Sequence, residues 1–161
     1  FKHILEATDV ALEAINLYRL DEGKALAEDI QLRIANISRL LTDVISIDPD
    51  RIASVKERLR KAVSDLKEQV DENRFEQELI YYLEKYDITE EKVRLDNHLK
   101  YFTDAINSED SNGKKLGFIS QEIGREINTI GSKSNHAAMQ QMVVQMKDEL
   151  EKIKEQLLNV L

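Results

Sequence analysis

A carboxylate and an imidazole follow one line on a single predicted helix. Glu91, Leu95, His98 and Phe102 are separated by steps of four, three and four residues, which places them on one helical face. Arg94 lies one turn from both Glu91 and His98. An acid and an imidazole beside an apolar stripe can ligate a divalent metal ion or act as an acid–base pair. A buried polar network is the commoner use of this spacing, so both interpretations stand.

A second pair of carboxylates lies further along the chain. Glu122 and Glu126 are one helical turn apart, with Arg125 between them. Two carboxylates on one face can hold Mg²⁺ or Mn²⁺, because these hard cations choose oxygen ligands. The alternative is an ordinary pair on a solvated face. Gln121 and Asn128 share a neighbouring face with Arg125, which suits hydrogen bonds to phosphate or to a partner helix.

Basic residues gather in the same region. Lys114 and Lys115 follow Gly113 at an expected helix start, where free backbone N–H groups and two ammonium groups can contact a phosphate. An ordinary exposed loop is the alternative. Residues 113–133 contain four cations and two anions, whereas the whole chain has a net charge of −8. The charge of the whole chain therefore argues against a uniform nucleic-acid-binding surface, but a local one remains open.

The composition indicates which elements must position these residues. The chain has 161 residues, of which 42% are hydrophobic and 34% charged, with one proline. That mixture is typical of long amphipathic helices. The absence of cysteine excludes disulfides and thiolate metal sites. No apolar run approaches the roughly 18 residues of a membrane span, and no secretory signal is recognised, so we expect a cytoplasmic protein without a membrane partner.

Apolar residues recur in steps of three and four along most of the chain, which is the pattern of a buried helical face. The first apolar face runs from Ile4 through Ile15 and Tyr18 to Ile45. We expect one long helix here that continues across Gly23. The stripe from Met139 to Val160 predicts a coiled-coil seam. We predict a single all-α domain over residues 1–161, built of long antiparallel helices with coiled-coil-like packing. The expected helices span about residues 1–46, 49–86, 89–108, 113–131 and 134–161.

Two helix boundaries have chemical signals. Asp48 can accept hydrogen bonds from free N–H groups as an N-cap, and Pro49 suits the first position of a helix. Asp87 or Thr89 can cap the helix that follows. Asn73 either breaks the second helix or lies within it.

Residues Gly113–Ser134 read GKKLGFISQEIGREINTIGSKS. This order of a basic pair, Phe, Gln-Glu, Arg-Glu, Asn-Thr and Ser-Lys-Ser resembles the C-terminal domain of the YicC family of bacterial proteins. Upstream, Asn73–Glu78 reads NRFEQE and Asp87–Glu91 reads DITEE, and both resemble family motifs. The resemblance implies that the N-terminal domain of the family is absent here.

The resemblance also implies a function: metal-dependent endoribonucleases that cleave RNA phosphodiester bonds and assemble as homohexamers. RNA and further copies of the chain are then the expected partners, and Mn²⁺ or Mg²⁺ the expected cofactor. The candidate catalytic residues are Glu122, Glu126 and His98, and the candidate metal ligands are Glu91, Glu122 and Glu126. Glu76, Glu78 and Glu90 are further acidic candidates. The candidate RNA contacts are Arg74, Arg94, Lys114, Lys115, Arg125 and Lys133.

Two other classes of function remain open at this point. A helical oligomerisation or interaction module would use the apolar seams for assembly and the polar residues to fix how the helices align. A non-catalytic RNA-binding protein would use the same cations and leave RNA intact. If the acidic and basic residues meet at one place, the enzyme is favoured, whereas internal ion pairs dispersed between helices favour the interaction module.

Overall fold

The computed structural model of the chain describes residues 2–65, 71–108 and 113–158. In these ranges every regular element is an α-helix, which confirms the all-α prediction. The helices are α1 (Lys2–Asp65), α2 (Glu72–Lys85), α3 (Thr89–Ile106), α4 (Gly113–Lys133) and α5 (Ala137–Leu157). No helix within the described ranges is long and apolar enough to cross a membrane.

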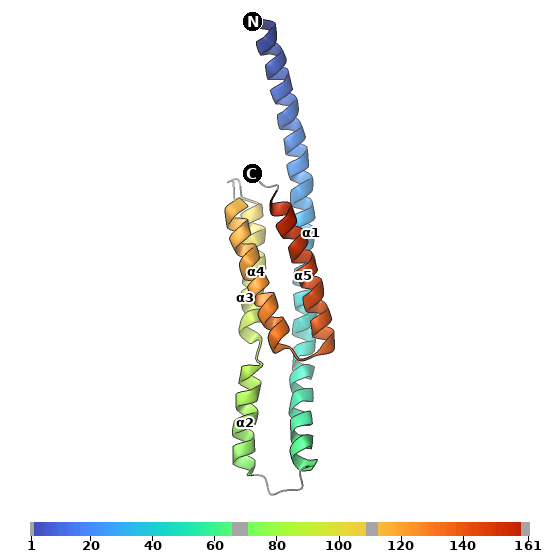
Figure 1. The fold of residues 1–161 in the computed structure, drawn as a ribbon, viewed down its shortest axis with the longest axis vertical. Coiled ribbons are helices and arrows are strands. Elements are labelled where there is room, and N and C mark those ends of the chain that lie inside the picture. The colour runs from blue at the N-terminus through green and yellow to red at the C-terminus, as the bar shows by residue number, and fades with distance from the viewer. Residues whose placement is uncertain (1, 66–70, 109–112, 159–161) are drawn as a thin grey trace.

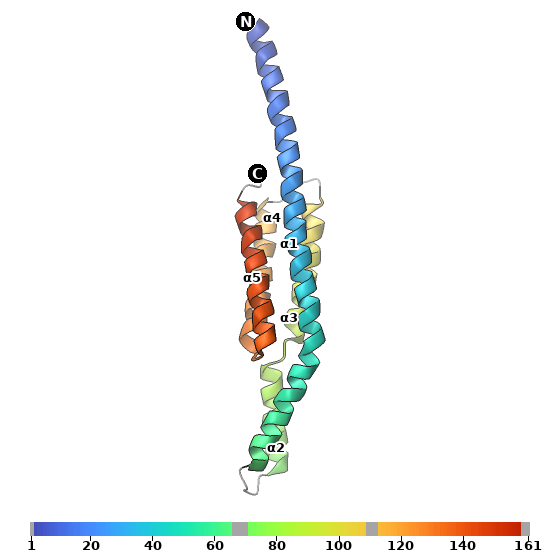
Figure 2. The same cartoon turned by 90° about the vertical axis from the view of Figure 1, so that its right-hand side faces the viewer.

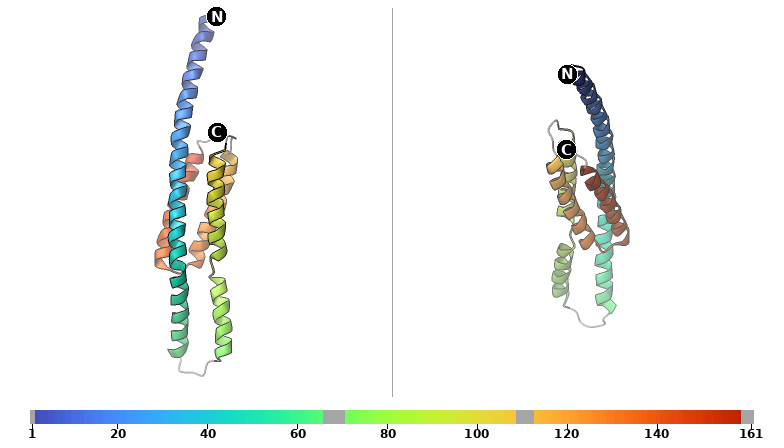
Figure 3. Two further views of the ribbon diagram at one scale, coloured as in Figure 1. Left: turned by 180° about the vertical axis from the view of Figure 1, so that it is seen from behind. Right: turned by 45° about the horizontal axis from the view of Figure 1, so that its top comes forward.

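Four of the helices pack side by side as a bundle (Figure 1). The neighbours are α1 with α5, α5 with α4, α4 with α3, and α3 with α1. Each neighbouring pair is antiparallel, as the course of the chain in Figure 1 shows. Helix α2 continues below α3 and lies beside the lower part of α1, as Figure 3 shows from behind. The middle of the molecule is therefore a bundle of α1, α3, α4 and α5, and the part below it is the pair of α1 and α2.

The apolar stripes of all four bundle helices meet in one core. Each stripe supplies residues that are fully buried, among them Ile37, Phe102, Ile123 and Ile153, each 0% exposed. The predicted stripe of the last helix is buried from Met139 to Ile153. Burying each such side chain contributes about 1.5–3 kcal/mol, so the shared core accounts for the association of the helices.

The expected helix boundary at Asp48 and Pro49 is not present, because α1 continues through both residues to Asp65. A proline inside a helix loses one backbone hydrogen bond and usually kinks or breaks the helix. Here Pro49 is exposed, and so is Ile45, whose carbonyl loses its partner and can bind water instead. Asp48 is 2% exposed and binds both Arg51 and Lys92, which holds the chain in place across the proline. Figure 2 shows α1 bending where it leaves the bundle.

The expected second helix of residues 49–86 is two helices in the structure. Its first part is the end of α1, and its last part is α2, with residues 66–70 outside the described ranges. Asp71 caps α2 by accepting hydrogen bonds from the backbone N–H groups of Asn73 and Arg74, at 3.0 and 3.4 Å. The break thus comes two residues before Asn73, because an aspartate satisfies the free donors of the helix start.

The first part of α1 projects beyond the bundle without a packed neighbour in the described chain (Figure 1). The expected buried face there is wrong: Ile4, Ile15 and Tyr18 are 69%, 54% and 68% exposed. The helix does continue through Gly23, as expected. The apolar periodicity correctly predicted a helix, but α1 is longer than the helices that pack on it.

A cluster of polar residues ties α1 to α5. The Glu149 carboxylate accepts hydrogen bonds from Asn36 at 2.9 Å, Arg33 at 3.5 Å and Lys152 at 2.8 Å. Desolvation by burial acts to raise the pKa of Glu149, but the hydrogen bonds from Lys152 and Asn36 and the nearby positive charges outweigh it. The net effect lowers the pKa below its ordinary value of 4.5.

Candidate functional site: the seam between α3 and α4

An ion pair joins the start of α3 to the end of α4. Lys133 Nζ lies 2.7 Å from Glu91 Oε1 and donates a second hydrogen bond to the backbone carbonyl of Asp87 at 3.0 Å. The Glu91 side chain is 7% exposed, and that of Lys133 is 33% exposed. Among the described residues, the other carboxylate oxygen of Glu91 is buried without a hydrogen-bond partner. A buried carboxylate left half-satisfied costs free energy, so the ion pair with Lys133 is what compensates the charge of Glu91 at this end of the two helices.

Asp87 lies two residues before the start of α3, the helix that holds Glu91. The Asp87 side chain accepts from the backbone N–H and the hydroxyl of Thr89, at 3.1 and 2.7 Å. Desolvation opposes ionisation, but the two Thr89 hydrogen bonds and the charge of Lys92 outweigh it and lower the pKa of Asp87 below its ordinary value of 3.8. The N-cap residue of α3 is Ile88, which makes no side-chain capping hydrogen bond, so neither Asp87 nor Thr89 is the cap that the sequence predicted.

At the opposite end of the same two helices, a cation lies over an aromatic ring. The Lys115 ammonium is 4.7 Å from the centroid of the Tyr101 ring. This contact is a cation–π interaction between α4 and α3. Tyr101 is half exposed, so the ring remains accessible from solvent.

The residues between these two contacts lie on facing lines. On α3, Glu91, Arg94, His98 and Tyr101 are spaced by three, four and three residues, and a helix places such residues on one face. On α4 the matching line contains Lys115, Glu122, Glu126 and Lys133, spaced by seven, four and seven. Helices α3 and α4 are antiparallel neighbours (Figure 1). Because the ends of the two lines touch, we expect the middle residues to follow the same side of the helix pair. We call these eight residues the α3–α4 seam.

The middle of the seam contains the three predicted catalytic residues. His98 is half-buried, and Glu126 is 4% exposed without a hydrogen bond or ion pair to any other described residue. Glu122 is more accessible and forms a weak ion pair with Arg125, at 3.5 Å, whose side chain is 72% exposed. No hydrogen bond or ion pair joins His98 to Glu122 or Glu126 among the described residues, so the imidazole and the two carboxylates lie along the seam without being paired with one another.

The three predicted metal ligands, by contrast, are not gathered into one site. In the ranges that the structure describes, no three side chains among His, Asp and Glu lie close enough together to hold a metal ion. Glu91 is at the level of Lys133, and Glu122 is eleven residues away on α4, which is about 16 Å along a helix. Glu91 also has a cation beside it already. The residues of the described chain therefore do not fit a three-ligand metal site, and we derive no chemical step through a metal ion.

The predicted RNA contacts divide into two groups. Lys115 and Lys133 lie on the seam, and so does Arg94, which forms an exposed ion pair with Glu90. Arg125 lies beside the seam on the exposed face of α4. Two predicted contacts lie elsewhere: Lys114 is exposed at the start of α4, and Arg74 is exposed on α2. The further acidic candidates Glu76 and Glu78 are likewise exposed on α2.

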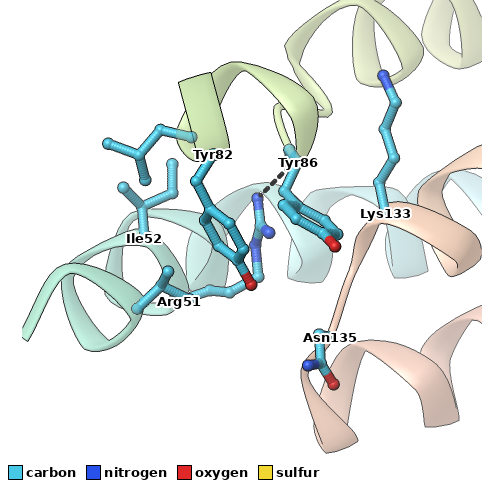
Figure 4. A pocket seen from close by; sticks show the side chains of 8 residues that line it. Arg51, Ile52, Tyr82, Tyr86, Lys133 and Asn135 are labelled. Carbon is cyan, nitrogen blue, oxygen red and sulfur yellow. Dashed lines mark hydrogen bonds between the residues drawn. The ribbon is translucent and has the colours of Figure 1, made fainter. Parts of the chain in front are cut away.

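The place where α2, α1 and the α4–α5 turn meet was missed by the analysis of the sequence. Buried Arg51 lies there, 4% exposed, and donates to Asp48 at 2.8 Å and to the backbone carbonyl of Tyr86 at 3.1 Å. Lys92 binds the other oxygen of Asp48 at 2.7 Å. A hollow beside this cluster, which we call the joint pocket, is shown in Figure 4. It is lined by Arg51, Ile52, Val55, Tyr82, Leu83, Tyr86, Lys133 and Asn135.

A sequence signal for the joint pocket was present. Tyr82 and Tyr86 are four residues apart on one helical face, and their rings are in contact, with centroids 4.5 Å apart. The four-residue spacing alone could have indicated this aromatic pair. The partner residues from α1 and from the α4–α5 turn could not be assigned, because they lie far from this tyrosine pair in the sequence.

The chain is similar to known proteins along nearly its whole length. A family model described as "Endoribonuclease YicC-like, C-terminal" matches residues 44–161. A protein of Clostridioides difficile named "Probable endoribonuclease YicC" is 38% identical over 158 residues, covering 96% of this chain and 54% of that protein. A protein of the same name from Haemophilus influenzae is 34% identical over 157 residues, covering 98% of this chain and 55% of that protein. The chain thus spans about half the length of these curated relatives. With a family match that contains the whole α3–α4 seam, the chain belongs to the YicC-like endoribonuclease C-terminal domain family.

Proposed function

We propose that this chain is the helical part of an endoribonuclease and that an RNA strand lies along the α3–α4 seam. The observation that carries the proposal is the order of residues on the seam. Lys115 and Lys133 stand at its two ends, and His98 and Glu126 lie between them. The two lysines are 18 residues apart on α4, about 27 Å along the helix, so they can contact separate phosphates of one strand. The names of the relatives support RNA as the substrate.

The seam residues suit proton transfer at the RNA backbone. A ribose 2′-hydroxyl that loses its proton can attack the neighbouring phosphorus, and the bond to the 5′-oxygen of the next nucleotide then breaks. His98 is the imidazole of the seam and accepts the hydroxyl proton, while a water molecule gives a proton to the departing 5′-oxygen and a 2′,3′-cyclic phosphate remains. The Glu126 carboxylate on the facing helix α4 favours the positive charge that His98 then carries. The lysines offset the negative charge that develops on the phosphate oxygens.

A requirement for Mn²⁺ or Mg²⁺ remains part of the proposal. Such a cation would offset charge on the phosphate. Since Glu91 lies about 16 Å from Glu122 along the bundle, its ligands would have to include groups beyond the three predicted carboxylates. Comparing cleavage with added Mn²⁺ and with a chelator tests this requirement.

The catalytic proposal is tested with the full-length protein and a defined RNA. We expect His98→Ala to lower the cleavage rate by about 10²- to 10⁴-fold, the range for loss of a general acid–base group. Glu126→Gln should also lower the rate while helicity is retained. The matched control is Glu84→Gln, an exposed carboxylate on α2 to which no role is assigned and which should leave the rate unchanged. Cleavage that is unaffected by both seam substitutions would refute the assignment.

Two observations favour a second function, an oligomerisation module. The acidic candidates are dispersed along the bundle, with Glu91 in an ion pair between helices and no three possible metal ligands gathered among the described residues, which is the arrangement expected of such a module. The projecting part of α1 exposes Ile4, Ile15 and Tyr18, and contiguous exposed apolar side chains are typical of interaction surfaces. The homohexamer implied by the family resemblance is one assembly that could cover them. Light scattering of the Ile15→Glu variant tests this function, with an unchanged particle mass as the result against it.

A further inference from the structure

Helix α4 has an exposed face whose composition is unusual for this chain. Its exposed residues recur in steps of four, three, four, three and four, which places them on one side of the helix. We call these residues the α4 outer face: Lys114, Phe118, Gln121, Arg125, Asn128 and Ser132. Two of them are cations and none is an acid, although the chain as a whole has a net charge of −8. Each of the other helices exposes at least one carboxylate, so this face differs in charge from the rest of the surface.

The packing of the bundle leaves the α4 outer face open. Helix α4 packs against α3 and α5, and its apolar stripe faces the shared core. The outer face lies on the remaining side of the helix and points to solvent (Figure 1). A ligand can reach it without a rearrangement of the fold, so little ordering of the protein opposes binding.

An aromatic ring without a ring partner lies in the outer face. Phe118 is 68% exposed, and within the described ranges its ring makes no aromatic or cation–π contact. A methyl group added at the neighbouring Gly117 would meet nothing within 4 Å, so the space beside the ring is open as well. Covering such a side chain stabilises a complex by about 1.5–3 kcal/mol, and a planar ligand can cover it by stacking.

The two cations of the outer face lie on either side of this ring along the helix. Lys114 precedes Phe118 by four residues and Arg125 follows it by seven, which separates the two cations by about 16 Å along the helix. Lys114 has no ion pair with any other described residue. Arg125 lies 3.5 Å from Glu122, and their side chains are 72% and 43% exposed. An ion pair this exposed contributes little, so a phosphate group can compete for the arginine.

The composition of the outer face fits a nucleic acid better than a protein. Protein interfaces bury about 800 Å² on each partner around an apolar centre, whereas Phe118 is the only apolar residue of the six. Cations hold phosphates, an exposed aromatic ring stacks on a base, and amide side chains such as Gln121 and Asn128 can bond to the edges of bases. The outer face therefore offers the groups that single-stranded nucleic acids require.

We propose that the α4 outer face binds single-stranded RNA, with one unpaired base stacked on Phe118 and phosphates at Lys114 and Arg125. The proposal rests on the proposed function, because the strand is the one on the α3–α4 seam, and the two surfaces meet where Arg125 pairs with Glu122. Recognition of RNA outside double helices commonly uses bases splayed onto aromatic side chains. A base within a duplex stays stacked on its neighbours, so Phe118 selects single-stranded segments, loops or bulges.

The experiment uses the full-length protein and a single-stranded 2′-O-methyl oligonucleotide that contains 5-iodouridine. The 2′-O-methyl groups remove the nucleophile, so binding is measured without cleavage. Irradiation joins 5-iodouridine to an aromatic side chain stacked on it, and we expect mass spectrometry to locate this cross-link at Phe118. Phe118→Leu should remove the cross-link and weaken binding, measured by fluorescence anisotropy, by about 5- to 100-fold. Phe118→Tyr keeps a ring and should retain both. The matched control is Tyr81→Leu, which removes an aromatic side chain on α2 that is 66% exposed and should change neither result.

The results separate this proposal from the proposed function. If Lys115→Ala weakens binding while Phe118→Leu keeps full affinity and no cross-link forms at Phe118, RNA lies on the seam and the outer-face proposal is wrong. If the wild-type protein does not bind the oligonucleotide, both proposals fail. If a duplex of the same sequence cross-links at Phe118 as well as the single strand does, the selectivity for unpaired bases is wrong. If Phe118→Leu changes the particle mass in light scattering and leaves RNA affinity intact, the outer face is a contact between copies and the proposal is overturned.

Discussion

Replacing glycine by alanine should change the stability of the fold in opposite directions at two positions of α4. One of them, Gly131, lies where α4 contacts α5. A methyl group added at Gly131 would lie 2.9 Å from Val143 Cγ1, closer than carbon atoms pack. Val143 is 2% exposed, and its branched side chain has one strongly preferred rotamer in a helix, so it cannot move aside freely. At Gly117 an added methyl group meets nothing within 4 Å.

The magnitudes follow from two opposing effects. Replacing glycine by alanine inside a helix stabilises the helix by about 1 kcal/mol. Overpacking a well-filled core destabilises it by about 1–3 kcal/mol. Gly117→Ala should therefore raise the free energy of unfolding by about 1 kcal/mol, and Gly131→Ala should lower it by about 1 kcal/mol. For a chain of this size each change corresponds to roughly 2–4 °C in Tm.

Urea denaturation followed by circular dichroism measures both variants against the wild type. The difference between the two variants, about 2 kcal/mol, isolates the clash with Val143 because the gain in helix propensity is common to both. If Gly131→Ala proves as stabilising as Gly117→Ala, α5 does not approach α4 as closely as described, and the packing argument fails.

Four further predictions follow from the described contacts. Lys133→Met should destabilise the fold by about 2 kcal/mol. This is less than the roughly 3–5 kcal/mol for breaking a fully buried ion pair, because Lys133 is partly exposed. A double-mutant cycle with Glu91→Gln measures the coupling energy of the ion pair. Phe102→Ala, at a fully buried position, should lower the free energy of unfolding by about 3–5 kcal/mol in urea titrations. Because the pKa of Glu149 is lowered in the folded state, this carboxylate stabilises the fold above pH 4.5, and the stabilisation is lost as the pH falls below that value. Glu149→Gln should therefore weaken the pH dependence of the free energy of unfolding, as measured by denaturation from pH 6 to pH 3. Arg125→Ala should weaken RNA binding and reduce the slope of log affinity against log salt by about one, as measured by filter binding at several salt concentrations.

The sequence predicted the helices well because each of them has an apolar stripe of its own. The buried positions of α3 and α5 followed directly from three- and four-residue steps. Pro49 misled the prediction, since its local preference for a helix start is worth less than the contacts of buried Asp48 with Arg51 and Lys92. The lysine lies 44 residues further along the chain, and no local signal indicates it.

The spacing of residues in the sequence predicted only part of the candidate site. The line of Glu91 and His98 on α3 could be drawn from the sequence, because residues three and four apart share a face. The pairing of Lys133 with Glu91 could not be predicted from the sequence, because it depends on the antiparallel packing of α3 and α4. The same limit applies to grouping Glu91 with Glu122 as metal ligands, because similar chemistry says nothing about the level at which each residue lies in the bundle.

Helix α1 has two parts that should differ in local stability, the projecting part and the part packed in the bundle. From about residue 26 onward its amide groups are protected by the bundle, and opening them requires breaking the core. The preceding six turns have only intrinsic helix propensity, which is marginal for a segment of about 20 residues in water. Their amide hydrogens should therefore exchange with deuterium orders of magnitude faster than those of the same helix a few turns further on. Slow exchange in the full-length protein would reveal that another part of the assembly covers this segment.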